Sequence, residues 1–261
     1  IPFVKPGKSA PYDVMGAHAA AQALQDAGAD YELVQQAYVG YVYGDSTSGQ
    51  RTIYQLGMTG IPVINVNNNC STGSSALYLA RQAVESGAAD CVLALGFEQM
   101  RPGALGNQFD DRPSPLADFV DAAQTVSPAP GTPMAPLLFG AAGAEYLERY
   151  GVGPETFARV SVKARRHAEH NDKAIFRTQV TEDEVLQSPQ IFGPMTRLQC
   201  CPPTCGAAAA VIVSERFAKK HNLPRDVAIL GQSMTTDFPS TFEENSMIKV
   251  VGYDLTASAS Q

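Results

Sequence analysis

The stretch INVNNNCSTGSSALYLARQAVESGAADCVLALG runs from Ile64 to Gly96 and shows three successive patterns. An apolar run ends in three asparagines and Cys70. Small and apolar residues then repeat at helical spacing until Gly87, a residue type that commonly ends a helix. From Cys91 onward the chain is apolar without alternation, which predicts a strand covered on both faces. The stretch therefore predicts a strand, a helix and a second strand, as in a parallel βαβ unit.

The segments on either side continue this alternation of helices with apolar strands. Asp13 is expected to cap the first helix and Gly28 to end it. We predict helices at residues 13–28, 71–86, 141–150, 154–171, 181–187 and 214–221, and strands at residues 37–42, 62–66, 91–96, 206–213 and 227–231. The strands at 62–66, 91–96 and 206–213 are expected to be buried. This order predicts an α/β fold with helices on both faces of a sheet.

Residues 101–140 differ from the rest of the chain. They are rich in Pro, Gly and Asp, and they show only weak periodicity. A segment of this length is too long for an ordinary connector between two elements. We therefore predict a functional excursion or lid in this part of the chain.

The composition indicates a globular protein and limits its partners. Of 261 residues, 44% are hydrophobic and 17% are charged, which is enough for one large domain or two smaller ones. The net charge of -7 gives no general attraction for nucleic acid or an anionic membrane, although a local basic patch would suffice for a phosphorylated substrate. No stretch is long and apolar enough to span a bilayer, and the first residues lack the apolar segment of a signal peptide.

The five cysteines do not form a regular framework. Their odd number and irregular spacing argue against a secreted disulfide scaffold and favour a reducing compartment. Cys200, Cys201 and Cys205 lack the paired spacing and the histidine that are typical of a zinc site, so no metal site is predicted. Cys91 lies in the middle of an apolar run and is expected in the core.

Cys70 follows a predicted strand and is expected at the N-cap or in the first turn of the next helix. The N–H groups and the positive dipole end of that helix would stabilise a thiolate there. A backbone N–H at the same place would also donate to an oxyanion when the thiolate attacks a carbonyl. These properties favour a nucleophilic cysteine. The alternative is a small buried residue, which is the usual place of a free cysteine.

The segments VNNNCSTGSSALYLARQ and ADCVLALGFEQM closely resemble the thiolases, and within them the sterol carrier protein X type, or SCP2-thiolase. VGYVYGDSTSGQR, GMTGIPVINV, LQCCPP and the region around DFPSTFEENSMIKVVGYD add to the match, which extends nearly from end to end. The resemblance implies a layered αβαβα fold. Residues 1–100 and 206–224 would form its N-terminal half, residues 101–205 a loop or lid domain with helices, and residues 225–261 the start of a C-terminal half whose remainder is absent.

The resemblance also implies a reaction. Thiolases cleave a 3-ketoacyl-CoA with free CoA, or form the same C–C bond in reverse, through an acyl thioester on a cysteine that matches Cys70. Phe139 and Gly140 match the positions where thiolases contact the pantetheine arm of CoA, although Phe139 could instead be an aromatic packing residue before a helix. CoA is a substrate in this reaction, and no metal or redox cofactor is implied. Thiolases are dimers or larger, so a homodimer or higher oligomer is expected.

Several catalytic parts of a thiolase have no match in this chain. A GHP-type histidine, a second acid–base cysteine and an HDCF-type motif belong to the C-terminal part of the family's sequence, and none of the four histidines lies in such a motif. His167 and His170 are expected on an exposed face of a basic helix. Cys205 stands where relatives usually carry an aspartate. We therefore expect this chain alone to be an inactive part of a thiolase.

Two other functions fit the same residues. A thiolase-fold aldolase that cleaves steroid side-chain CoA esters would not need the cysteine, and the complete NNNC context of Cys70 counts against this reading. A catalytically silent thiolase-like module would bind a lipid or a partner protein. The compartment expected for an SCP2-type thiolase is the cytoplasm, or the peroxisome if the source is eukaryotic.

Overall fold

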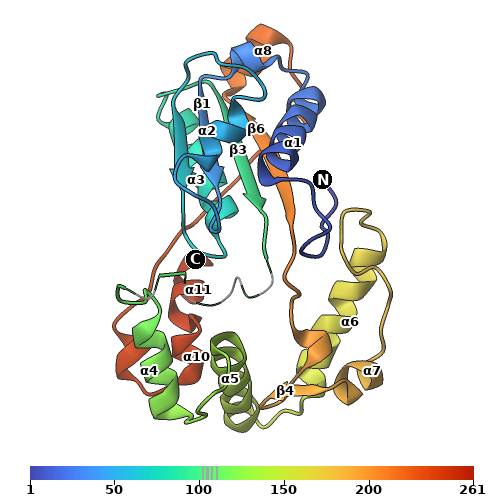
Figure 1. The fold of residues 1–261 in the computed structure, drawn as a ribbon, viewed down its shortest axis with the longest axis vertical. Coiled ribbons are helices and arrows are strands. Elements are labelled where there is room, and N and C mark those ends of the chain that lie inside the picture. The colour runs from blue at the N-terminus through green and yellow to red at the C-terminus, as the bar shows by residue number, and fades with distance from the viewer. Residues whose placement is uncertain (102, 104–105, 107, 110) are drawn as a thin grey trace. The chain divides into compact units, whose positions relative to one another are not determined.

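The structure is a computed structural model that describes residues 1–101, 103, 106, 108–109 and 111–261. The chain divides into two compact units (Figure 1). Unit 1 comprises Ile1–Ala104 and Pro203–Met234, and unit 2 comprises Leu105–Pro202 and Thr235–Gln261. Residues 102, 104, 105, 107 and 110 of the predicted excursion lie outside the described residues. The assignment of chain segments to the halves of a thiolase fold stays a prediction.

Unit 1 is built on a sheet in which the described residues form strands in the order β2-β1-β3-β6. These strands are β1 (Gln36–Gly40), β2 (Val63–Val66), β3 (Cys91–Glu98) and β6 (Gly206–Val213). β1 pairs in parallel with β2 and β3, whereas β6 runs antiparallel to β3. Gly40 lies opposite both Val66 and Gly96, so the carboxyl ends of β1, β2 and β3 meet at one edge of the sheet.

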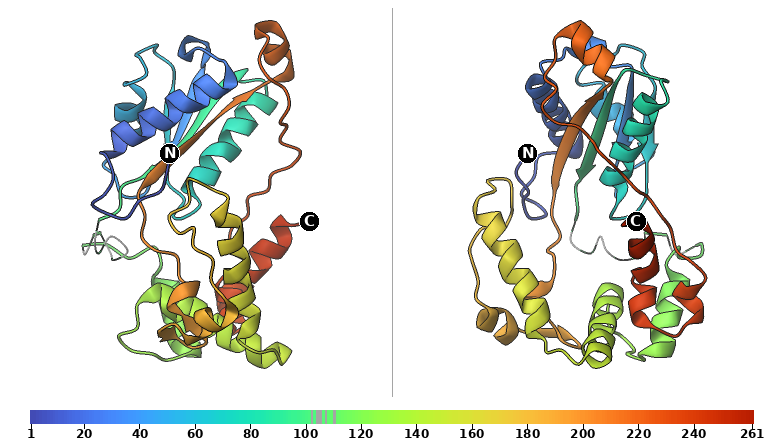
Figure 2. Two further views of the ribbon diagram at one scale, coloured as in Figure 1. Left: turned by 90° about the vertical axis from the view of Figure 1, so that its right-hand side faces the viewer. Right: turned by 180° about the vertical axis from the view of Figure 1, so that it is seen from behind.

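Helices cover both faces of this sheet, as the sequence predicts (Figure 2). α1 (Tyr12–Ala27) and α2 (Ser48–Ile53) pack on one face, and α3 (Thr72–Glu85) packs on the other. The short 3-10 helix η1 (Tyr31–Leu33) precedes β1, and α8 (Glu215–His221) follows β6. The two covered faces leave little of the sheet's centre in contact with water.

β1 and β3 each have a neighbouring strand on both sides, and β3 is the more deeply buried of the two. The predicted burial of residues 91–96 is therefore confirmed. β2 and β6 are the edge strands and are mostly half-buried, so the prediction of full burial is wrong for both. Their apolar sequences resemble that of β3, but an edge strand has a neighbour on one side only.

Unit 2 is mainly helical. Its elements are α4 (Ala117–Val126), α5 (Met134–Tyr150), α6 (Glu155–Glu169), α7 (Glu182–Gln187), β4 (Gln190–Phe192), β5 (Met195–Thr196), η2 (Arg197–Gln199), α9 (Ser240–Glu243), α10 (Met247–Val250) and α11 (Tyr253–Ala259). α5 packs against α4 and α10, with Ala123, Leu137 and Met247 buried in the contact. Within the described parts of both units, no helix is at once long and apolar enough to pass through a membrane.

The predicted excursion contains more helix than its sequence suggests. It includes α4, and α5 begins at Met134 rather than at residue 141. Pro133 precedes α5 and Pro136 lies in its first turn, where no backbone N–H is needed for an intrahelical bond. The prolines therefore mark the start of a helix and not an irregular segment.

Two further predictions are corrected in unit 1. α1 begins at Tyr12, so Asp13 lies in the first turn and not at the N-cap, and its carboxylate pairs with Arg51 at 2.9 Å. The predicted strand at 227–231 has no regular secondary structure, and Val227 and Leu230 are 93% and 95% exposed. None of the described strands pairs with this segment, and an extended segment without a partner leaves its backbone groups to water.

Candidate active site

The candidate site lies at the carboxyl edge of the sheet, where β1, β2 and β3 end. Ligands of parallel α/β sheets bind at this edge. Cys70 lies in the loop between β2 and α3, Tyr43 follows β1, and Glu98 is the last residue of β3. Of these three residues, the sequence predicts only Cys70 as a site residue. Tyr43 and Glu98 become candidates because the fold brings their strand ends together.

Cys70 lies one position before Ser71, the N-cap residue of α3, and not at the predicted N-cap or first turn. Asn69 causes this difference, because its φ of 48° is left-handed, a conformation that asparagine tolerates better than most residues. The N–H of Thr72 donates to the carbonyl of Asn69 at 3.1 Å, which closes a turn before the helix. The Cys70 side chain is exposed, so the alternative of a buried packing residue is wrong.

The asparagines around this turn tie the loop to α3. The amide nitrogen of Asn68 donates to Oγ of Ser75 at 2.8 Å, and its backbone N–H donates to Oγ1 of Thr72 at 2.9 Å. The N–H of Asn69 donates to Oδ1 of Asn67 at 3.2 Å. The position of Cys70 is therefore set by hydrogen bonds to the first turns of the helix that follows it.

The start of α3 approaches the sheet closely at two glycines. A Cβ atom at Gly40 would lie 2.7 Å from the carbonyl oxygen of Thr72. A Cβ atom at Gly96 would lie 3.2 Å from the Cα atom of Gly73. A glycine inside a strand commonly marks such a close backbone approach. A side chain at Gly40 would push the start of α3, and Cys70 with it, away from the strand ends.

The Glu98 carboxylate joins the end of β3 to the segment after β1. Its Oε2 accepts a hydrogen bond from the N–H of Val42 at 3.0 Å, and its Oε1 accepts one from the N–H of Tyr43 at 3.1 Å. Burial raises the pKa of Glu98, and the backbone N–H groups oppose this shift. A charged residue at the end of an otherwise apolar run is the sequence signal that points to Glu98.

The Tyr43 phenol lies within the electrostatic influence of Glu98 and Cys70. Burial raises the pKa of Tyr43, and the negative charges of Glu98 and Cys70 raise it further. The phenol therefore stays protonated at neutral pH. Nothing in the sequence around Tyr43 singles it out, because it lies in a polar, glycine-containing loop whose path only the structure shows.

The other cysteines are less suited to nucleophilic attack. Cys91 is fully buried in β3, as predicted, and burial raises its pKa to about 11. Cys205 is also buried, and its thiol donates to the carbonyl of Met100 at 3.4 Å. Burial and the neighbouring Cys201 raise the pKa of Cys200. Cys201 is exposed like Cys70, but it belongs to unit 2 and not to the loop between β2 and α3.

Phe139 and Gly140 lie on α5 of unit 2 and have different surroundings. Phe139 lines a pocket of about 290 Å³ within unit 2 and is 59% exposed. Gly140 is buried and does not line this pocket, because a Cβ atom there would lie 2.7 Å from the carbonyl oxygen of Phe192. The structure therefore associates Phe139 with a cavity and Gly140 with close packing of α5 against β4.

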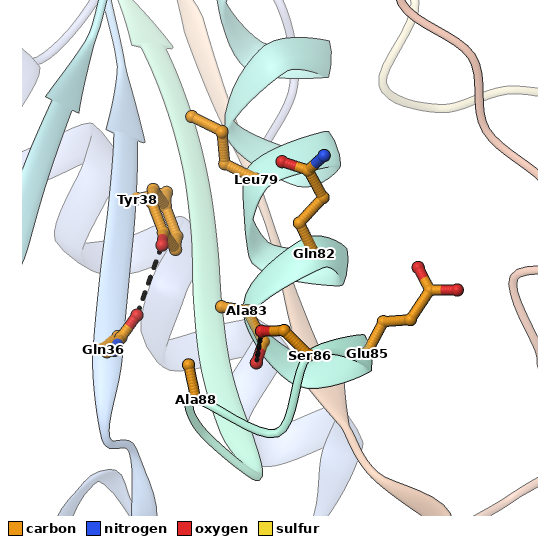
Figure 3. A pocket seen from close by; sticks show the side chains of 8 residues that line it. All are labelled: Gln36, Tyr38, Leu79, Gln82, Ala83, Glu85, Ser86 and Ala88. Carbon is orange, nitrogen blue, oxygen red and sulfur yellow. Dashed lines mark hydrogen bonds between the residues drawn. The ribbon is translucent and has the colours of Figure 1, made fainter.

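A second cavity, of about 540 Å³, lies in unit 1 beside the first residues of β1 (Figure 3). Cys70 follows β2, whose carboxyl end meets that of β1 at the other end of the strand. Its lining combines the first residues of β1 with the last turns of α3 and the segment after it. The Tyr38 hydroxyl donates to Oε1 of Gln36 at 3.3 Å inside it. This cavity is separate from the strand ends that carry Cys70.

None of the four histidines lines either of these two cavities. His167 and His170 are exposed on α6 and at its end, as predicted. In the part of the chain that the structure describes, no three His, Cys, Asp or Glu side chains gather as metal ligands would.

Comparison with known proteins identifies a common family. A model described as "Thiolase, N-terminal domain" matches residues 2–216. Sterol carrier protein 2 of Gallus gallus is 51% identical over 262 residues, which cover 99% of this chain and 48% of that protein. The chain thus spans about half the length of this curated relative.

Solved structures show the same fold at lower identity. The Ltp2-ChsH2(DUF35) aldolase is similar over 100% of this chain and 68% of its own, with a TM-score of 0.74 and 22% identity. Human mitochondrial 3-ketoacyl-CoA thiolase in complex with CoA is similar over 85% of this chain and 65% of its own, with a TM-score of 0.62 and 19% identity. At these identities the likeness concerns the fold.

Proposed function

The chain belongs to the thiolase family, and from this premise we propose that it forms the nucleophile-bearing part of an acyl-CoA C-acyltransferase of the SCP2-thiolase type. One observation carries the proposal. Cys70 is exposed at the carboxyl edge of three parallel strands, in a loop fixed by the start of α3. A thiol in that place is accessible to a carbonyl compound and lies beside the positive end of a helix dipole.

In this mechanism the Cys70 thiolate attacks the C3 carbonyl of a 3-ketoacyl-CoA. The C2–C3 bond then breaks, the acyl group remains on sulfur as a thioester, and the departing acetyl-CoA carbanion takes up a proton. The thiol of a second CoA loses a proton and attacks the thioester, which releases the shortened acyl-CoA and free Cys70. Covalent catalysis of this kind replaces one difficult step with two easier ones.

The proton transfers need groups other than Cys70. We assign them to the length that the relatives have beyond this chain, because none of the four histidines of this chain lies in a GHP-type or HDCF-type motif. Backbone N–H groups at the start of α3 and the Tyr43 phenol would stabilise negative charge near the sulfur. CoA acts as a substrate in this scheme.

The test is thiolysis of acetoacetyl-CoA in the presence of CoA. The reaction is monitored through the loss of absorbance of the 3-ketoacyl thioester. We expect turnover by a protein extended to the full length of its relatives, called the extended protein below. We expect no turnover by the 261-residue chain alone. An inactive extended protein with a correct fold would contradict the proposed activity. Turnover by the 261-residue chain alone would contradict the assignment of the proton-transfer groups to the additional length of the relatives.

A thiolase-fold aldolase is the second candidate, because the solved structure of the Ltp2-ChsH2(DUF35) aldolase is similar over the whole chain. The exposed Cys70 favours thiolysis, since aldol cleavage would have no use for the nucleophile. A module that only binds a lipid or a partner protein would show neither activity. We further propose a homodimer or larger assembly, and the cytoplasm or the peroxisome as its compartment.

A further inference from the structure

We propose that Met234 is a positioning residue for Cys70, and that its thioether sulfur holds the asparagine loop in place through Ser75. Met234 is the last residue of unit 1 and lies in a segment without regular secondary structure, at residues 227–238. The fold brings it to the start of α3, 166 positions along the chain from Asn68. The mechanism proposed above gives this residue no role.

Two hydrogen-bond donors converge on the Met234 sulfur. The hydroxyl of Ser75 donates to Sδ at 3.6 Å, and the amide nitrogen of Asn68 donates to the same atom at 3.9 Å. The Asn68 amide also donates to Oγ of Ser75 at 2.8 Å, so its two N–H groups both have acceptors. A thioether sulfur is a weak acceptor, and here it completes a network of Asn68, Ser75 and Met234, called the Met234 network below.

The Met234 network satisfies a buried hydroxyl group. Ser75 is 4% exposed, and its O–H group donates to the Met234 sulfur. A buried donor without an acceptor is costly, so the hydroxyl would turn to another acceptor if the sulfur were removed. A serine inside a helix commonly bonds to the carbonyl one turn back. That rotation would move the lone pairs of Oγ that now accept from the Asn68 amide.

Asn68 connects the Met234 network to the nucleophile. Its backbone N–H donates to the hydroxyl of the first residue of α3 at 2.9 Å, and its carbonyl accepts from the N-cap hydroxyl at 2.7 Å. Only Asn69 separates Asn68 from Cys70. Because the backbone and the side chain of Asn68 are both fixed, the short loop has little freedom, and Cys70 is held at the start of α3.

Packing alone does not account for the position of Met234. The side chain is 46% exposed, and it belongs to none of the apolar clusters that the described residues form. An apolar side chain that stays in contact with water gains little free energy from burial. The polar contacts of the sulfur are therefore what distinguishes methionine from leucine at this position.

Two substitutions of Met234 separate hydrogen bonding from packing. Met234→Leu keeps an apolar side chain of similar volume but lacks the acceptor. Met234→Gln keeps an acceptor on an unbranched side chain of similar length. If the sulfur acts as an acceptor, glutamine should replace methionine better than leucine does. If the side chain only packs, leucine should be the better replacement.

The test measures the order of the loop and the reactivity of the thiol on the 261-residue chain. Hydrogen–deuterium exchange reports on the peptide that contains Cys70, and mass spectrometry gives its rate of alkylation by iodoacetamide at neutral pH. In Met234→Leu we expect exchange to be about threefold to tenfold faster and alkylation to be slower by a similar factor. Alkylation slows because the loosened thiol spends less time beside the N–H groups at the start of α3. Met234→Gln should stay close to the wild type in both measurements.

Two further variants complete the experiment. Met58→Leu is the matched control, because Met58 is 79% exposed in unit 1 and should leave both rates unchanged. Ser75→Ala removes the residue through which Met234 acts, so it should reproduce the effects of Met234→Leu. Adding Met234→Leu to Ser75→Ala should then change the rates little further, as expected for two residues that act as one unit.

The inference rests on the proposed function only in taking Cys70 as the nucleophile, and its test needs no turnover. An effect of Met234→Leu equal to or smaller than that of Met234→Gln would overturn the inference. Faster exchange without any change in the alkylation of Cys70 would overturn it as well, because the loop would then not position the thiol. Either result would leave the thiolysis test unaffected, and an inactive extended protein would leave the order of the variants unaffected.

Discussion

Replacing Cys70 with alanine is expected to lower thiolysis by the extended protein by about 10³-fold or more, because the covalent route through the acyl thioester is lost. The thermal unfolding temperature should not change, since the Cys70 side chain is exposed and makes no core contact. The measurement is the rate of acetoacetyl-CoA cleavage at saturating CoA, together with the unfolding curve.

Cys201→Ala is the matched control for this substitution. Cys201 is also exposed, but it belongs to unit 2 and not to the loop between β2 and α3, so its replacement should leave the rate unchanged. If Cys70→Ala retained the wild-type rate of thiolysis, Cys70 would not be the nucleophile. If it lost thiolysis but retained cleavage of a β-hydroxyacyl-CoA, the aldolase candidate would become the better description.

Gly40→Ala is expected to destabilise unit 1 by about 1–3 kcal/mol, the usual cost of forcing extra atoms into a packed region. The new Cβ would lie 2.7 Å from both the carbonyl oxygen and the Cγ2 atom of Thr72. Because Thr72 begins α3, the helix start and the Cys70 loop must move. In the extended protein we expect thiolysis to fall by about tenfold to a hundredfold as well, since misplacement by an ångström has effects of that size.

Gly73→Ala provides the comparison for Gly40→Ala. The nearest atom to its added Cβ is the Cα of Gly96 at 3.9 Å, an ordinary contact, and alanine has the higher helix propensity. Its stability should therefore stay within about 1 kcal/mol of the wild type. Chemical denaturation measures both variants. Equal stabilities of Gly40→Ala and Gly73→Ala would show that the close approach of α3 to β1 is not a constraint.

Much of unit 1 could be predicted from local sequence patterns. The apolar run of β3 and the small-residue stripe of α3 correctly indicate these elements, and the helix predicted at 214–221 corresponds closely to α8. The thiolase-like α/β fold is confirmed by the family match and by the similar solved structures. These features depend on short-range periodicity and capping, which a single sequence displays directly.

The incorrect predictions have long-range causes. Whether the apolar segments of β2 and β6 are central or at an edge depends on the order of strands, and the segment at 227–231 lacks a strand to pair with among the described residues. The prolines before α5 suggested a loop, although they suit the first turn of a helix. Local composition does not distinguish these alternatives.

In the candidate site, too, some features follow from local sequence and others depend on the fold. Cys70 is identifiable because its sequence context resembles that of a known family, but its offset from the helix start depends on the left-handed Asn69. Glu98 and Tyr43 come from different segments that only the sheet register brings together.

Transfer of an acyl group to the sulfur of Cys70 is the central chemical claim. Peptide mass spectrometry tests it directly on the extended protein, mixed with acetoacetyl-CoA without added CoA and quenched in acid. We predict an acetyl group on the peptide that contains Cys70 and none on the peptide that contains Cys201. Continued turnover of substrate in a sample whose Cys70 peptide never carries an acyl group would contradict the claim.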